Sequence, residues 1–113
     1  MEGEEAAAEW LRANGFEILY RNWRSGRYEL DIVATNFDRI HFVEVKTRKA
    51  GSLISGVEAV DERKRQRILL SANDYIVKTL NEKQPRFDVA EVVVSKNESG
   101  KTSYKLRYIE NAF

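Results

Sequence analysis

Alternating apolar and polar positions predict most of the secondary structure of this chain. Residues 16–24, 27–35 and 39–48 are rich in aromatic and β-branched residues, and the turn-forming sequences Ser25-Gly26 and NFD separate them. Runs of this kind, bounded by turn residues, are typical of consecutive β-strands. The first half of the chain therefore predicts a three-stranded meander.

Two other segments have helical spacing. Residues 3–13 are rich in Ala, Glu and Leu and stop at an Asn-Gly pair, a common end for a helix. From Asp61 to about Leu80, apolar residues recur at helical intervals after the basic sequence RKRQR. We expect an α-helix in each segment, the second ended by Pro85, the only proline.

The last third of the chain completes the sheet. Residues 86–95 and 103–111 have the pattern of strands around a turn at 97–100, and the looser sequence KAGSLISG follows the third strand. The long connection between the third and fourth strands permits a crossover to a parallel position. The predicted fold class is α/β, a mixed β-sheet flanked by α-helices in the order α-β-β-β-α-β-β.

Composition narrows the class of protein. The 113 residues, of which 42% are hydrophobic and 33% charged, suit one domain spanning 1–113. The formal net charge of +1 means that any site for a polyanion must come from local clustering. There is no cysteine, no basic segment followed by an apolar one at the start, and no membrane-length apolar stretch. We expect a cytoplasmic protein with no membrane partner.

Ionisable residues lie in pairs on two neighbouring predicted strands. Glu29 and Asp31 are two apart in YELDIVA, and Glu44 and Lys46 are two apart in FVEVKTR, so each pair shares one face of its strand. A turn symmetric about the intervening Phe-Asp pair places Asp31 opposite Glu44. Glu29 then faces Lys46.

Opposed carboxylates at Asp31 and Glu44 repel unless a proton or a cation lies between them. Oxygen ligands suit Mg²⁺ or Mn²⁺, which are often held by one or two carboxylates together with water and phosphate oxygens. Lys46 would then align an attacking water or stabilise a phosphate oxygen. The simpler alternative is an ordinary ion pair between Glu29 and Lys46 on a solvated sheet face.

Several ordered motifs resemble one protein family. They are GEEAAAEWL, GFEILYRNWR, YELDIVA, FVEVKTR, RFDV and the final IENAF, and together they cover nearly the whole chain. In these motifs the chain is similar to the YraN family, also called UPF0102, of the restriction-endonuclease-like fold. That fold includes archaeal Holliday junction resolvases and other PD-(D/E)xK nucleases.

The resemblance implies a metal-dependent endonuclease acting on DNA, with branched DNA as a candidate substrate. It implies that Glu4, Asp31, Glu44 and Lys46 match the catalytic pattern, and that the main-chain carbonyl of Val45 joins the metal shell. One departure bears on substrate access. Where the family has glycine before the first strand acid, this chain has Tyr28.

Basic residues interleave with aromatic ones around the proposed site and are candidates for contact with DNA phosphates. The set comprises Arg21, Arg24, Arg27, Arg48, Lys49 and Lys64. Cations that guard a strand edge, or a helix face charged for solubility, explain the same pattern without DNA. The family also has a lysine at the position of Lys64.

Other residues have simpler interpretations. His41 alternates away from Glu44, which favours a packed or surface histidine over a catalytic one. In RFDV, an internal salt bridge or a strand edge explains Arg86 and Asp88. We expect three aromatic residues to fill the core: Trp10, Tyr20 and Phe42.

Three functions remain open at this point. The first is the nuclease, which as a resolvase would require a two-fold homodimer. The second is a nuclease-fold module for DNA binding or assembly that has no turnover. The third is a structural protein whose charged rows are only ion pairs.

Overall fold

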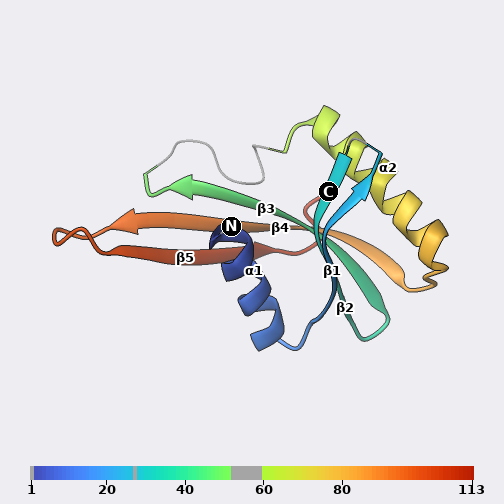
Figure 1. The fold of residues 1–113 in the computed structure, drawn as a ribbon, viewed down its shortest axis with the longest axis horizontal. Coiled ribbons are helices and arrows are strands. Elements are labelled where there is room, and N and C mark those ends of the chain that lie inside the picture. Colours follow the sequence, from blue (N-terminus) through green and yellow to red (C-terminus); the bar gives the residue numbers. More distant parts are fainter. Residues whose placement is uncertain (1, 27, 52–59) are drawn as a thin grey trace.

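The computed structural model describes residues 2–26, 28–51 and 60–113, and it confirms the mixed α/β architecture (Figure 1). The order α-β-β-β-α-β-β is also as predicted. The elements are α1 (Glu2–Ala13), β1 (Glu17–Ser25), β2 (Tyr28–Asn36), β3 (Arg39–Lys49), α2 (Glu62–Thr79), β4 (Gln84–Lys96) and β5 (Thr102–Ile109).

The five strands form one sheet in the order β1-β2-β3-β4-β5. Among the described strands only β3 and β4 run parallel, since the connection that holds α2 carries the chain back to the start of the sheet, and the other neighbouring pairs are antiparallel. The β2–β3 register runs from Ile32 opposite Val43 to Asn36 opposite Arg39. This is the predicted register, centred on the Phe-Asp turn.

The ends of α2 are set by local hydrogen bonds. The Asp61 side chain caps the first turn by accepting from the backbone N–H of Lys64. At the other end Leu80 adopts a left-handed conformation with φ of 53°, and its N–H bonds back to the last turn. Pro85 lies within β4, so the prediction that it ends the helix is wrong.

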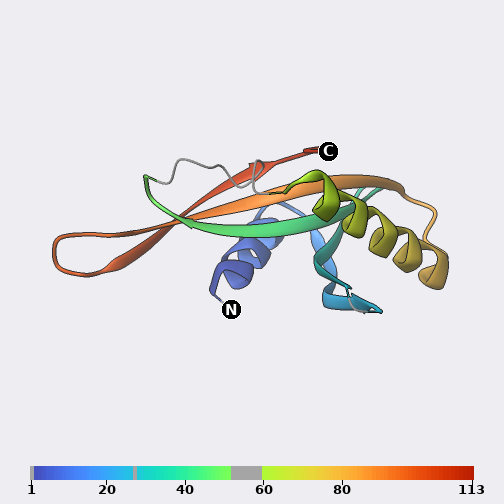
Figure 2. The same cartoon turned by 90° about the horizontal axis from the view of Figure 1, so that it is seen from above.

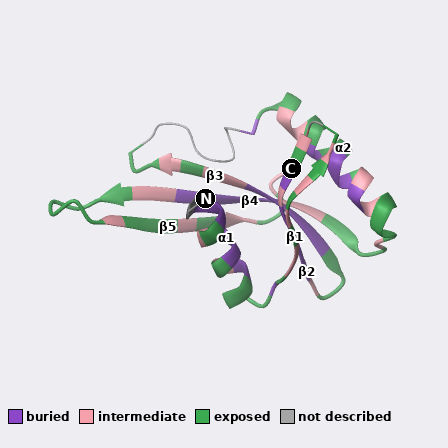
Figure 3. Ribbon diagram, in the orientation of Figure 1, coloured by how far each residue is buried: buried purple, intermediate pink, exposed green. Residues whose placement is uncertain are grey.

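Each face of the sheet carries its own apolar core. Phe42, Val89 and Val33 pack on the side covered by α2, where Tyr75 and Ala72 of the helix meet them. The side covered by α1 has a second cluster, formed by the helix residues Ala7, Ala8 and Leu11 with Phe16, Ile32, Ala34, Val43 and Ala90. Buried residues gather along the central strands of the sheet, as Figure 3 shows.

The three aromatic residues predicted for the core differ in burial. Phe42 is buried, and Trp10 is half-buried and stacks on Tyr108 with ring centroids 4.5 Å apart. Tyr20 is 52% exposed, so its assignment to the core is wrong. The β1–β2 register shifts between Ile18 and Tyr20, and this irregularity breaks the alternation on which the prediction rested.

The hairpin of β4 and β5 extends well away from both helices, and the molecule is about 50 Å long as a result (Figures 1 and 2). The loop predicted from KAGSLISG begins with the turn at Ala50 and Gly51, and the rest of it lies outside the described residues. Of the two helices described, neither is long and apolar enough to cross a membrane.

A buried polar network joins the strands on the α1 side. Asp88 is fully buried, and its carboxylate lies 2.6 Å from Nδ1 of His41, so the predicted internal salt-bridge partner of Asp88 is a histidine. The same carboxylate accepts from the Tyr108 hydroxyl and from the backbone N–H of Asn111. The network ties the end of the chain to the centre of the sheet. His41 is packed, on the face opposite Glu44.

Replacing Asp88 by Ala should destabilise the fold by about 3 to 5 kcal/mol, because the change leaves the buried His41, the half-buried Tyr108 hydroxyl and the backbone N–H of Asn111 without their shared acceptor. Urea unfolding followed by circular dichroism measures the difference. The control is Asp38→Ala in the exposed β2–β3 turn, for which we expect a change within about 0.5 kcal/mol. Equal losses for both variants would contradict the structural role of the network.

Candidate active site

Strands β2 and β3 separate at the predicted acids. Their backbone pairing stops at Ile32 and Val43, whereas β2 continues to pair with β1 up to Tyr28. The tip of the β1–β2 hairpin turns toward α2 while β3, β4 and β5 run in another direction (Figure 1). At this fork the backbone N–H of Val45 donates to Oδ2 of Asp31 at 2.9 Å. A carboxylate thus replaces the backbone carbonyl that a continuous ladder would supply.

Glu44 lies at the same fork and is 4% exposed. Its Oε1 is 2.8 Å from Nζ of Lys64 on α2 and 3.4 Å from Nζ of Lys46 on its own strand. The Asp61 side chain accepts a hydrogen bond from the backbone N–H of Lys64 and thereby fixes the position of the Lys64 backbone at the start of α2. Two strands and one helix therefore bring together Asp31, Glu44, Lys46 and Lys64.

The crowded acids change the proton affinity of Asp31. Burial, the charge of Glu44 and, more weakly, that of Glu4 raise the pKa of Asp31 to about 7. The hydrogen bond from Val45 and the charge of Lys64 act in the opposite direction but are outweighed. The ionised form of Asp31 is therefore disfavoured beside Glu44, and either a proton or a bound cation would relieve that penalty.

The two lysines differ in their proton affinity. Partial burial and the neighbouring Lys64 lower the pKa of Lys46. Burial alone would also lower the pKa of Lys64, but its contacts with Glu44 and Lys46 and the charges of Glu44 and Asp31 together outweigh that effect, and the pKa is raised. Lys46 is thus the lysine better suited to exchange a proton, and Lys64 the more permanent charge.

A cavity of about 230 Å³ opens beside the acids. Its walls are Tyr28, Glu29, Asp31, Glu44, Lys64, Arg67 and Ile68. The Tyr28 ring, which stands where the resembling family has glycine, lies under the Arg67 guanidinium with 5.4 Å between Cζ and the ring centroid. Arg67 was not predicted as a site residue, although its helical spacing of three from Lys64 places both on neighbouring parts of one helix face.

Glu4 approaches the site from α1. It is 8% exposed, and Asn22 of β1, with its amide nitrogen turned toward the acids, donates to Glu4 at 2.9 Å and to Glu29 at 2.7 Å. A Cβ at Gly3 would meet the side chain of Thr47, so the close approach of α1 to β3 requires glycine there. Asn22 was missed, and its positive φ of 54° was not readable from the sequence.

The acids have the chemistry of a magnesium or manganese site. Asp31 and Glu44 offer hard oxygen ligands, and Asp31 lacks a full counter-charge. Within residues 2–26, 28–51 and 60–113, no group of three or more Asp, Glu, His or Cys is arranged to hold a metal. The donor set therefore fits an ion bound by two carboxylates and completed by water or phosphate oxygens, and not a closed protein cage.

The remaining predicted residues lie in different places. Arg21 pairs with Glu5 at 2.8 Å, and Arg24 pairs with Glu29 at 3.5 Å across β1 and β2. The ion partner of Glu29 is therefore Arg24, and Lys46 pairs with Glu44 instead.

Arg48 pairs with the buried Glu91 at 3.1 Å, and Lys49 lines a second cavity near the end of β3. Arg27 lies outside the described residues. The predicted roles of these arginines and of Lys49 in DNA contact stay predictions.

Replacing Asp31 by Asn should stabilise the metal-free protein above pH 7. With a folded pKa near 7 and an unfolded pKa near 4, ionisation of Asp31 costs stability as pH rises through that interval. The gain should be on the order of 2 to 4 kcal/mol at pH 8 and should vanish below about pH 4. Urea unfolding in the presence of a chelator, at both pH values, measures it.

The matched control for this comparison is Glu29→Gln, which changes an acid on the same strand that is partly exposed and paired with Arg24. We expect no gain at pH 8, since a partly exposed ion pair contributes at most about 1 kcal/mol. A stability difference between Asp31→Asn and the wild type that stays constant from pH 4 to pH 8 would contradict the assignment.

Comparisons with known proteins identify the same family as the sequence motifs do. Residues 3–92 match the family described as "Uncharacterised protein family UPF0102". A UPF0102 protein of Porphyromonas gingivalis is 46% identical over 112 residues, which are 99% of this chain and 81% of the relative. One from Clostridium acetobutylicum is 44% identical over 98% of this chain and 89% of its own length. The chain therefore belongs to the UPF0102 family.

Proposed function

We propose that this protein is a metal-dependent endonuclease that hydrolyses phosphodiester bonds in DNA, with branched DNA as the preferred class of substrate. The observation that carries the proposal is the fork at Asp31, where Asp31, Glu44 and Lys64 line one cavity and Nζ of Lys46 lies 3.4 Å from Glu44. The resemblance to PD-(D/E)xK nucleases supports the same assignment, because those acids and Lys46 match its pattern.

Each residue has a chemical role in this proposal. Asp31 and Glu44 would hold Mg²⁺ or Mn²⁺, Glu4 would support the water shell, and the carbonyl of Val45 would complete the shell. The ion, when bound, lowers the pKa of water and neutralises charge on the phosphate. Lys46 would orient the attacking water, and Lys64 would move from Glu44 to a phosphate oxygen.

A DNA-binding or assembly module without turnover is the second candidate. The contacts of Lys46 and Lys64 with Glu44 favour it, because they already balance the charge of that acid in the absence of an ion. The two candidates make different predictions for metal binding and for cleavage, which can be measured separately.

Incubation of the purified protein with linear, nicked and four-way DNA in Mg²⁺ or Mn²⁺ is the experiment that tests the proposal. We expect cleavage, strongest on the four-way substrate, and no cleavage by Glu44→Gln. Retention of all three DNAs with no product in either ion would support the binding module and exclude the nuclease.

Mn²⁺ binding should depend on both strand acids. In calorimetric titrations the wild type should release binding heat that Asp31→Ala and Glu44→Ala each lose, since a site with only two protein carboxylates cannot spare one. Asp38→Ala serves as the control and should titrate like the wild type. Unchanged heats for the two site variants would place the ion elsewhere and sink the proposed mechanism.

Lys46→Ala should lower the cleavage rate at saturating DNA by about 100-fold, while DNA affinity changes by less than about threefold. The reason is that a group acting on the attacking water contributes mainly in the transition state. Single-turnover kinetics and fluorescence anisotropy give the two values. Arg39→Ala, at the exposed start of the same strand, is the control, and equal losses of rate and affinity in Lys46→Ala would contradict the assigned role.

A further inference from the structure

The face of the sheet that bears the acids continues beyond α2 onto β4 and β5. Lys46 pairs with Glu91, and Glu91 with Arg107, so these three side chains form one row across β3, β4 and β5. The next row consists of Arg48, Val93 and Lys105. Directly paired residues point to the same side of a sheet, so Lys105 and Arg107 share the face of Lys46.

The packing of β5 confirms that Lys105 and Arg107 lie on the face of the sheet that α2 covers. Ile109, which has the same alternation as Lys105 and Arg107, packs against the core beneath α2. Leu106 and Tyr108 pack against the core beneath α1. The edge strand therefore has one face with two exposed cations and another with apolar and aromatic side chains.

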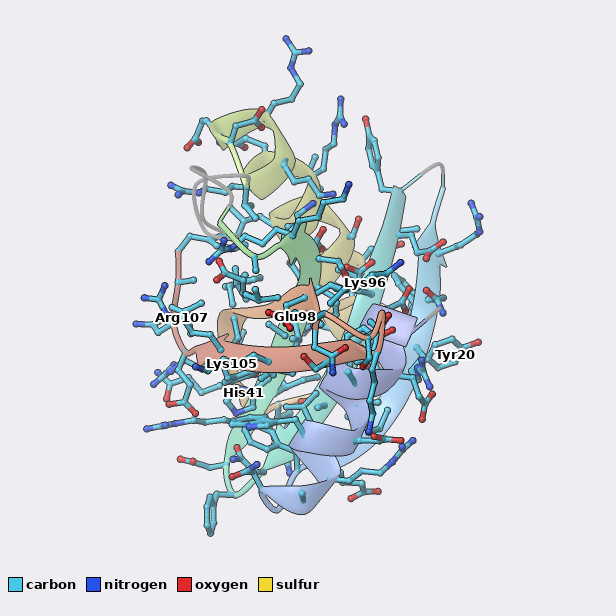
Figure 4. The ribbon with its side chains drawn as sticks, turned by 90° about the vertical axis from the view of Figure 1, so that its left-hand side faces the viewer. Tyr20, His41, Lys96, Glu98, Lys105 and Arg107 are labelled. Carbon is cyan, nitrogen blue, oxygen red and sulfur yellow. The ribbon has the colours of Figure 1, made fainter. Side chains whose placement is uncertain are left out.

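The two acids in or next to these rows, Glu91 and Glu44, are already paired. Glu91 is fully buried and lies 3.1 Å from Nε of Arg48, and Glu44 pairs with Lys46 and Lys64. The exposed charge of the two rows is accordingly positive. In Figure 4, Lys105 and Arg107 project from one side of the hairpin and Lys96 from the other.

The spacing of the rows suits nucleic acid. Neighbouring strands are about 4.8 Å apart, so the Cα of Arg107 is about 10 Å from that of Lys46. The grooves of B-DNA are about 6 and 12 Å wide, so phosphates on either side of a groove are separated by a similar distance. With Lys46 at the cleaved bond, Arg107 could therefore reach a phosphate near that bond. An arginine in such a position can bind a phosphate through two N–H groups.

We propose that Lys105 and Arg107, next to Arg48, form a phosphate-binding track that holds the duplex arm leading away from the cleaved bond. This inference rests on the proposed function only in taking DNA as the partner, and it assigns the β4–β5 hairpin to substrate binding. The track contacts backbone phosphates, so it holds DNA regardless of sequence.

Salt dependence of DNA binding tests the track. Anisotropy of a fluorescein-labelled duplex, measured in EDTA between about 50 and 200 mM NaCl, gives the slope of log affinity against log salt. The double variant Lys105→Ala with Arg107→Ala should lower the magnitude of this slope by about 1.8, since each phosphate contact contributes about 0.9. Lys105→Arg with Arg107→Lys should retain the wild-type slope.

The control is Lys96→Ala with Lys101→Ala, which removes the same charge from the other side and the tip of the same hairpin. We expect its slope to change by less than about 0.5. If both alanine pairs lower the slope equally, the effect is one of net charge, and the track is wrong. If neither changes it, the cations only protect the sheet edge, and the track is again wrong.

The outcome is separable from that of the nuclease assignment, because binding in EDTA requires no turnover. A track-specific slope in a protein that cleaves no DNA supports the inference and rejects the proposed nuclease. If the protein cleaves DNA but the two double-alanine variants have the same salt slope, the nuclease assignment is supported and the track is overturned. A wild type that binds no duplex overturns the track as well.

Discussion

The separation of β2 from β3 at Asp31 determines the geometry of the candidate site. A continuous antiparallel pair would satisfy the N–H of Val45 with a backbone carbonyl, whereas here the acceptor is the Asp31 carboxylate. That bond fixes one acid beside the strand that carries the other. Because both acids lie in a largely buried fork, their repulsion is weakly screened by water, and the site favours a cation.

Helix α2 links the stability of the fold to the charge of the site. Tyr75 packs edge-on against Trp23 and Phe42, and Asp74 accepts from Ser25 at the tip of the β1–β2 hairpin. The same helix, capped by Asp61, directs Lys64 to Glu44. Movement of its first turn would therefore change both the cover over the fork and the counter-charge on the acid.

Much of this arrangement could be predicted from the sequence because it depends on local pattern. The alternation in YELDIVA and FVEVKTR gave the face shared by the acids, and the symmetric turn gave the register from Ile32 opposite Val43 to Asn36 opposite Arg39. The predicted backbone pairing of Asp31 with Glu44 is absent from that register, because the strands separate there. The bulge near Tyr20 and the left-handed end of α2 at Leu80 could not be predicted, because each reflects backbone geometry that residue type does not specify. Lys64 was found as a basic residue, but its ion pair with Glu44 depends on how α2 crosses the sheet.

Lys105 and Arg107 were not predicted from the sequence as candidates for contact with DNA. Their spacing indicates a shared face, but only the parallel pairing of β3 with β4 shows that this face is the one bearing Lys46. Long-range pairing of strands that are distant in the chain is decided by the whole core, in which α1 and α2 cover opposite sides. Residue patterns alone fix neither partner nor side.

The most direct test of the central claim is the anomalous difference map of a crystal soaked in Mn²⁺. We expect one peak bridging the carboxylates of Asp31 and Glu44, with Nζ of Lys64 displaced from Glu44. A map without density there, in which Lys64 keeps its contact with Glu44 at high Mn²⁺ concentration, would contradict a shared cation at the fork.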